Sequence, residues 1–103
     1  GKGLATSGNY RKFRTDSSGR KIVHTVDPRT GQPVTSDLLS ATVVAETSAE
    51  ADAYGTALMV MGLERGKEFL AAHPEIQAYL IYSDEQGRFQ TYVTPELGRT
   101  IAR

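Results

Sequence analysis

The segment His24–Gly31 constrains the fold of this chain more than any other stretch of its sequence. Pro28 fixes its own φ and moves Asp27 out of the helical region, while Gly31 permits backbone conformations that other residues resist. The segment therefore cannot form a helix or the interior of a strand. We predict a strand that ends at Val26, followed by a tight loop that presents polar side chains in a fixed geometry. These side chains suit an anionic, phosphate-bearing ligand.

Length and composition exclude several classes of protein. A chain of 103 residues forms one domain at most. Its 12 basic and 12 acidic residues balance, so no overall field attracts nucleic acid or an anionic membrane. The absence of cysteine excludes a disulfide framework, a thiolate metal site and a thiol nucleophile. No apolar run is long enough to cross a bilayer, and Gly1–Leu4 does not form a signal peptide.

Hydrophobic periodicity and turn residues predict an α+β fold. Thr47 and Glu50 form a capping-box pattern that starts a helix, Gly62 is placed to end it, and Pro74 follows a second helix. Because the hairpins are segregated from the helices, we expect antiparallel strands with two helices packed on one face. The expected strands cover residues 4–14 with an interruption at 7–9, 21–26, 38–45, 79–82 and 88–93; the expected helices cover 51–61 and 64–72.

Asp52 and Thr56 are candidate metal ligands on the first helix. They stand four residues apart, so their side-chain oxygens project from one helix face. Both are hard oxygen ligands of the kind that Mg²⁺ takes beside a phosphate, and we expect Asp52 in the first turn, where the helix dipole favours its charge. The alternative is that Asp52 serves the helix end and that Thr56 bonds its own backbone.

The two histidines differ in what their positions imply. Histidine is the side chain best suited to accept a proton near neutrality, and Asp27 is close enough in sequence to orient the ring of His24. The alternative for His24 is a strand histidine whose ring is satisfied by a backbone carbonyl. His73, beside Pro74 at a helix end, is typical of a partner for the helix dipole.

Three blocks of the sequence resemble the FAD:protein FMN transferase family of the ApbE type. Ala5–Arg11 is similar to its A-T-S-G-[DN]-Y segment, and His24–Gly31 with Pro33 is similar to its H-x-x-D-P-x-T-G-x-P signature. Ala51–Leu58 is similar to its A-D-A-x-x-T-A-L helix. The blocks occur in the family's order, and the second is a specific signature. The resemblance covers the C-terminal third of the family, so residues 1–103 are expected to be a single domain or a fragment of such a protein.

The resemblance implies a reaction and a role for each block. The family cleaves FAD, transfers FMN to a Ser or Thr hydroxyl of an acceptor protein, and releases AMP. By similarity, His24 is the catalytic residue at the attacked phosphoryl group, and Asp52 and Thr56 hold Mg²⁺ on the FAD diphosphate. The residues implied in cofactor binding are Ser7, Gly8, Tyr10, Asp27, Arg29, Thr30 and Gly31.

Further expectations concern the setting of the chain. Because it starts within an expected strand, we expect an incomplete protein that is inactive alone and self-associates through exposed apolar surface. The family resemblance implies a periplasmic or cell-envelope location, with a membrane contact only through a lipid anchor outside this chain, and no nucleic acid partner. Two alternatives are a non-catalytic flavin- or nucleotide-binding module and a structural fragment that dimerises.

Overall fold

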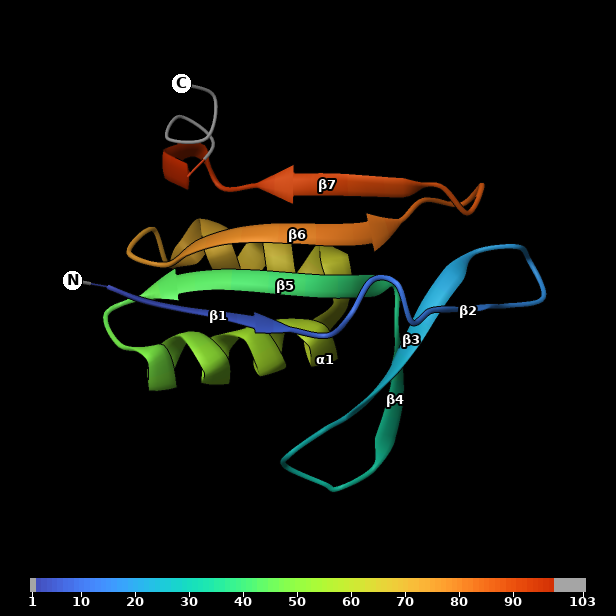
Figure 1. The fold of residues 1–103 in the computed structure, drawn as a ribbon, viewed down its shortest axis with the longest axis horizontal. Helices are drawn as coiled ribbons and strands as arrows, with labels where there is room; N and C mark the ends of the chain where they lie inside the picture. The colour runs from blue at the N-terminus through green and yellow to red at the C-terminus, as the bar shows by residue number, and fades with distance from the viewer. Residues whose placement is uncertain (1, 98–103) are drawn as a thin grey trace.

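The computed structural model describes residues 2–97 of the chain. Its elements follow one another as β1 (Gly3–Ser7), β2 (Arg14–Thr15), β3 (Lys21–Val26), β4 (Pro33–Ser36), β5 (Leu38–Ala45), α1 (Ser48–Ala72), β6 (Gln77–Ser83) and β7 (Phe89–Val93) (Figure 1). All paired strands are antiparallel. The expected α+β class is confirmed.

The main sheet contains four strands in the spatial order β1-β5-β6-β7, and α1 lies behind it in Figure 1. Side chains alternate between the two faces of a strand, so every second residue of β5 faces the helix. Ala41 and Val43 are buried there, whereas Thr42 between them is partly exposed. The fully buried leucines come from the strands and the helix alike, and each stabilises the fold by about 1.5–3 kcal/mol relative to exposure. They are Leu38, Leu39, Leu58 and Leu80.

The helical layer is one element interrupted at a single residue. Thr47 caps its start, with its hydroxyl accepting a hydrogen bond from the Glu50 N–H at 3.1 Å. Gly62 has φ 81° and ψ −179°, values that divide α1 into the two helices the sequence predicts. The Asp37 carboxylate accepts from the N–H of Leu63 at 3.2 Å and so caps the second half. Among residues 2–97, no helix is both long and apolar enough to cross a membrane.

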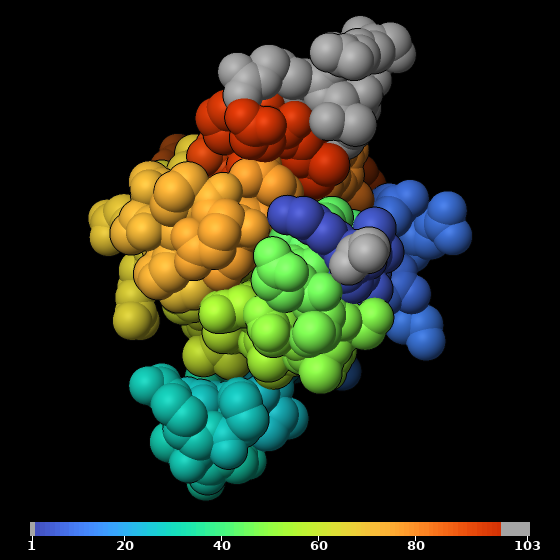
Figure 2. All heavy atoms as spheres, turned by 90° about the vertical axis from the view of Figure 1, so that its left-hand side faces the viewer, coloured from blue at the N-terminus to red at the C-terminus, as the bar shows by residue number. Residues whose placement is uncertain are grey.

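A second sheet, in the order β2-β3-β4, stands at one end of the main sheet. Its β3–β4 hairpin projects from the body of the molecule, as the separate cyan-to-teal lobe of Figure 2 shows. The hairpin pairs Val26 with Pro33 at its tip end and Val23 with Ser36 near its base. Part of α1 lies close to both strands of this hairpin. The projecting hairpin and α1 therefore lie beside each other.

The strands expected from the sequence do not include residues 33–36, where the structure has β4. Pro33 has no N–H, so the short segment resembles a loop when it is considered alone. In the structure Pro33 begins β4 at its pairing with Val26, the last residue of β3. Strand formation here depends on the partner strand and on the turn that returns the chain to it.

Three of the loops that join strands begin with an aspartate that binds the loop's own amides. Asp16 accepts from the N–H groups of Ser18 and Arg20, and Asp84 accepts from those of Gln86 and Arg88. Asp27 accepts in the same way from a residue two positions later, as described below. Hydrogen bonds to the charged carboxylates lower the pKa values of all three aspartates. The side chains of Ser18 and Arg29 contribute most at Asp16 and Asp27, and the Arg88 N–H contributes most at Asp84.

Candidate functional site

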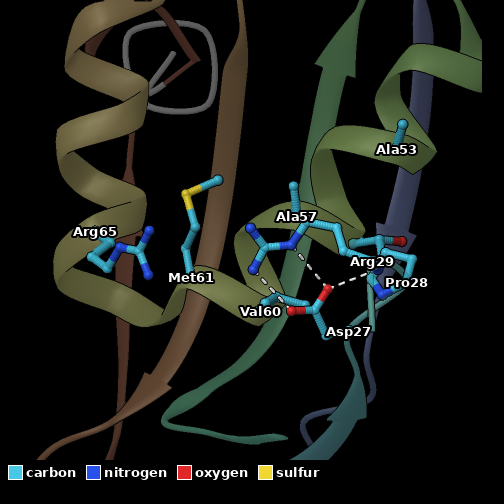
Figure 3. Close-up of a pocket in the computed structure, with 9 residues that line it drawn as sticks. Asp27, Pro28, Arg29, Ala53, Ala57, Val60, Met61 and Arg65 are labelled. Carbon is cyan, nitrogen blue, oxygen red and sulfur yellow. Dashed lines mark hydrogen bonds and ion pairs between the residues drawn. The ribbon is translucent and has the colours of Figure 1, made fainter. Parts of the chain in front are cut away.

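A pocket of about 530 Å³ lies between the tip of the β3–β4 hairpin and α1 (Figure 3). The hairpin contributes polar groups and the helix contributes a mainly apolar wall. Residues far apart in the sequence thus meet in one place, as expected for a site built from a loop and a rigid helix. The lining residues are Asp27, Pro28, Arg29, Ala53, Thr56, Ala57, Val60, Met61 and Arg65.

The loop at residues 27–32 owes its shape to hydrogen bonds around Asp27. The N–H of Asp27 donates to the Gln32 carbonyl at 2.9 Å, and the Asp27 carbonyl accepts from Thr30 at 3.2 Å and Gly31 at 2.8 Å. Gly31 has φ 72°, a conformation that favours glycine. The Thr30 hydroxyl accepts from the N–H of Gln32 at 3.2 Å, so this side chain serves the turn itself. The strand end at Val26 and the tight loop after it are confirmed.

Asp27 and Arg29 form the principal ion pair of the pocket. Arg29 donates from Nη2 to one carboxylate oxygen at 2.9 Å and from Nε to the other at 3.2 Å. The Asp27 side chain is 8% exposed, whereas that of Arg29 is 78% exposed. Side-chain hydrogen bonds from Arg29 lower the pKa of Asp27, its backbone N–H adds to the effect, and burial opposes it. The carboxylate in turn raises the pKa of Arg29. The pair is charged at neutral pH and holds the guanidinium plane in place.

His24 lies on β3 just before this loop, with an exposed side chain. It pairs across the hairpin with Thr35 and is not part of the pocket lining. The structure does not bring Asp27 to its ring, because both carboxylate oxygens of Asp27 are bound to Arg29. His24 is therefore open to solvent on the projecting hairpin, where a second macromolecule has access to it.

Asp52 and Thr56 lie in the first half of α1. Thr56 lines the pocket, and its hydroxyl donates to the backbone carbonyl of Asp52 at 3.1 Å. Asp52 is exposed, and its carboxylate has no hydrogen bond or ion pair within residues 2–97. It is not in the first turn as expected, because that turn contains Glu50 as its only acidic residue. Because α1 begins at Ser48, directly after its N-cap Thr47, Asp52 lies beyond the first turn.

These two oxygens suit a partly hydrated Mg²⁺. Because Thr56 donates its proton to the backbone, the lone pairs of its hydroxyl oxygen are left to accept a cation, and the Asp52 carboxylate is unengaged. The backbone bond of Thr56 and a ligand role are thus compatible. Within residues 2–97, no group of three or more acidic, histidine or cysteine side chains gathers around a possible metal. Mg²⁺ commonly keeps several waters and takes one or two carboxylates plus phosphate oxygens, so the donor set fits as a partial one.

Ser7, Gly8 and Tyr10 are not part of the pocket lining. A Cβ on Gly55 would lie 2.6 Å from the Ser7 hydroxyl oxygen, so Ser7 packs against the helix on the inner side of the sheet. Gly8, at φ 78°, has no space for a side chain because the Leu39 carbonyl would lie 2.7 Å from it. Tyr10 packs edge-to-face on Phe89, with ring centroids 5.7 Å apart. In this structure all three residues pack against the main sheet or α1.

The sequence patterns indicate no role for two residues that shape the pocket, Arg65 and Asp37. Arg65 lines the pocket from the second half of α1, and Asp37 caps that half through Leu63. The four-residue spacing of Ala57, Met61 and Arg65 along the helix was the available signal for Arg65. Met61 packs partly against the hydrophobic core and also lines the pocket. Nothing in the local sequence marks Asp37, because its role depends on where Gly62 interrupts α1.

His73 is the C-cap of α1 and contacts the Phe69 carbonyl at 2.8 Å, in line with its expected place.

Comparison with known proteins gives a consistent result. The model of the ApbE family matches residues 1–80. The chain is 40% identical over 96 residues to the FAD:protein FMN transferases of Klebsiella pneumoniae strain 342 and Escherichia coli K12. These matches cover 93% of this chain but 27% and 26% of those proteins. The chain therefore spans about a quarter of the length of the curated relatives it matches.

Solved structures agree in fold as well as in sequence. The apo form of the flavinyl transferase ApbE from Pseudomonas stutzeri superposes with a TM-score of 0.74 at 35% identity, covering 93% of this chain and 30% of that one. The flavin transferase ApbE from Vibrio cholerae superposes with a TM-score of 0.71 at 33% identity, covering 93% and 29%. The likeness thus covers both the main sheet and the projecting hairpin of this chain.

Proposed function

This chain belongs to the ApbE family, and from that premise we propose that it is the C-terminal part of an FAD:protein FMN transferase. The proposed reaction transfers FMN from FAD to a Ser or Thr hydroxyl of an acceptor protein and releases AMP. The acceptor oxygen attacks the phosphorus of the FMN half. The bond from this phosphorus to the bridging oxygen of the diphosphate breaks, and AMP leaves with that oxygen.

One observation carries the proposal. The Asp27–Gly31 loop and the helix face with Thr56 lie on opposite sides of a single pocket. They belong to the two sequence blocks that resemble the family most closely, and they are far apart in the chain. Their meeting around a pocket of nucleotide-compatible size supports a common role in holding one ligand.

His24 is proposed as the group that takes the proton from the acceptor hydroxyl. This role is supported by the exposed position of His24 on the projecting hairpin, near the end of β3 and just before the pocket loop. A protein acceptor needs such an accessible base, because its hydroxyl arrives on a folded surface. A positioned general base contributes about 10²–10⁴-fold in rate.

Asp52 and Thr56 would hold Mg²⁺ in the complete protein, with remaining ligands from water, the substrate and residues outside this chain. Bound there, Mg²⁺ would neutralise negative charge on the FAD diphosphate. The residues themselves would fix the position of the diphosphate relative to the pocket, because they project from a rigid helix. Asp27 and Arg29 would limit the space on the other side.

The proposal is tested with the full-length protein that carries this chain and with residues 1–103 alone. Each is incubated with FAD, Mg²⁺ and an acceptor protein. AMP is then measured by chromatography, and protein-bound flavin is measured by fluorescence after denaturation. We expect both products in equal amounts from the full-length protein and neither from residues 1–103. FAD binding without AMP release by the full-length protein would instead support a flavin-binding module, and neither binding nor release would support a structural role.

A further inference from the structure

The pocket contains two guanidinium groups that come from different elements. Arg29 extends from the hairpin loop, and Arg65 extends from the second half of α1 (Figure 3). Between them the helix presents the apolar side chains of Ala57, Val60 and Met61. The two cations have different surroundings, and that difference indicates which of them is available to a ligand.

The positive charge of Arg29 is already balanced by the carboxylate of Asp27. The Nε and Nη2 atoms of Arg29 donate to the two oxygens of Asp27 at 3.2 and 2.9 Å, and among the described residues that line the pocket Asp27 is the only acidic one. The pair carries no net charge. What it offers is a planar guanidinium held in a fixed orientation, a surface on which an aromatic ring stacks well.

Arg65 has no such partner. It is exposed, and within residues 2–97 its side chain makes no hydrogen bond or ion pair. Since Asp27 and Arg29 cancel, Arg65 leaves one positive charge unbalanced at the pocket. An unpaired guanidinium beside an apolar wall binds an oxyanion more strongly than one that must first leave a carboxylate.

The position of Arg65 depends on the break in α1. Gly62 separates it from the helix face with Thr56, and Asp37 fixes the start of the second half through the N–H of Leu63. Asp37 also pairs with Arg20 of the neighbouring turn at 3.6 Å. The start of the second helix, and hence the position of Arg65, is therefore fixed at the junction between β4 and β5.

We propose that Arg65 is the residue that selects the anionic group of a nucleotide in this pocket, while the Asp27–Arg29 pair serves as a wall for its planar ring. This inference rests on the proposed function and adds to it a specificity-determining residue. The ligand class is a phosphate-bearing compound with a flat heteroaromatic ring. A neutral nucleoside with the same ring fits the apolar wall but lacks the group that Arg65 recognises.

The test measures the binding of AMP and adenosine to the full-length protein by calorimetry, for the wild type and three variants. Arg65→Gln removes the charge, Arg65→Lys retains it, and Arg88→Gln is the matched control, on an exposed loop residue outside the pocket lining. We expect Arg65→Gln to weaken AMP binding about tenfold or more, as for the loss of a hydrogen bond to a charged group. Adenosine binding should stay within twofold, Arg65→Lys should retain part of the AMP affinity, and Arg88→Gln should match the wild type.

The outcomes separate this inference from the proposed function. If the wild type transfers FMN and Arg65→Gln binds AMP as the wild type does, the role of Arg65 is wrong and the proposed function stands. Equal weakening of AMP and adenosine overturns the inference as well, because it indicates a change in pocket shape. If the wild type binds neither AMP nor FAD, both the inference and the proposed function are overturned.

Discussion

Asp27 binds Arg29 twice over, once through the backbone and once through the side chain. Its carboxylate accepts from the Arg29 N–H at 2.9 Å as well as from the guanidinium. Asp27→Ala removes both contacts, whereas Arg29→Ala leaves the backbone contact in place. We expect amide hydrogen exchange at Arg29 to be about tenfold faster in Asp27→Ala, the scale of one lost charge-assisted hydrogen bond, and to change less in Arg29→Ala. Equal exchange in the two variants would mean that the backbone contact does not order the loop.

Stability should fall in acid through the three loop aspartates. Hydrogen bonds lower the folded pKa values of Asp16, Asp27 and Asp84 below their ordinary value of 3.8. A lowered pKa means that the charged form stabilises the folded state above pH 3.8, and that this stabilisation is lost as the pH falls through the folded values. The melting temperature, measured by circular dichroism, should be level from pH 7 to about pH 5 and decline below about pH 4.

One variant tests the contribution of Asp84 to the loss of stability in acid. Asp84→Asn keeps a carbonyl oxygen for the loop amides but cannot take up a proton in this range. The decline in melting temperature below about pH 4 should be shallower in this variant, since one fewer group is protonated on unfolding. An unchanged slope would show that Asp84 does not contribute.

The sequence predicts those parts of the fold that depend on local chemistry. The loop after Val26 follows from Pro28 and Gly31, and the start of α1 follows from the hydroxyl of Thr47. Each of these residues acts on backbone within a few positions of itself. The strand at 38–45 is found with the same bounds because its β-branched residues and burial agree.

The remaining features depend on contacts between distant segments. β4 forms because Pro33 meets Val26 in a hairpin, and Arg65 reaches the pocket because Asp37 caps the second half of α1. Asp27 pairs with Arg29 rather than with His24. Which of the two side chains reaches the carboxylate depends on the conformation of the turn. Such pairings depend on three-dimensional geometry, so the spacing of residues in the sequence does not predict them.

Self-association of residues 1–103 should depend on the outer face of edge strand β1. Leu4 is 63% exposed there and pairs with the partly exposed Val44 of β5, on the sheet face that α1 does not cover. Such a face favours association between copies. By light scattering after size-exclusion chromatography, we expect oligomers that Leu4→Ser reduces. Val26→Ser is the control, since Val26 is 56% exposed but lies on the projecting hairpin. A monodisperse monomer would contradict the expectation.

Removing the charge of Asp52 should affect metal dependence more than folding. Asp52→Asn in the full-length protein keeps the side-chain shape but removes the carboxylate that attracts a hard cation. We expect the Mg²⁺ concentration for half-maximal FMN transfer to rise about tenfold or more. The free energy of unfolding should change by less than about 0.5 kcal/mol, because Asp52 is exposed and without a partner in residues 2–97. Unchanged Mg²⁺ dependence would remove Asp52 from the proposed ligands.

The exposed position of His24 leads to a kinetic prediction for the full-length protein. His24→Ala should lower the turnover of FMN transfer at least about a hundredfold, the lower end of general-base effects. FAD affinity should stay within a few-fold, because a base that acts on the acceptor hydroxyl adds little to ground-state binding and His24 is outside the pocket lining. Stopped-flow fluorescence gives the affinity, and AMP release gives the turnover. Loss of FAD binding together with turnover would make His24 a cofactor contact. If neither changes, His24 is a solvent-exposed strand residue without a catalytic role.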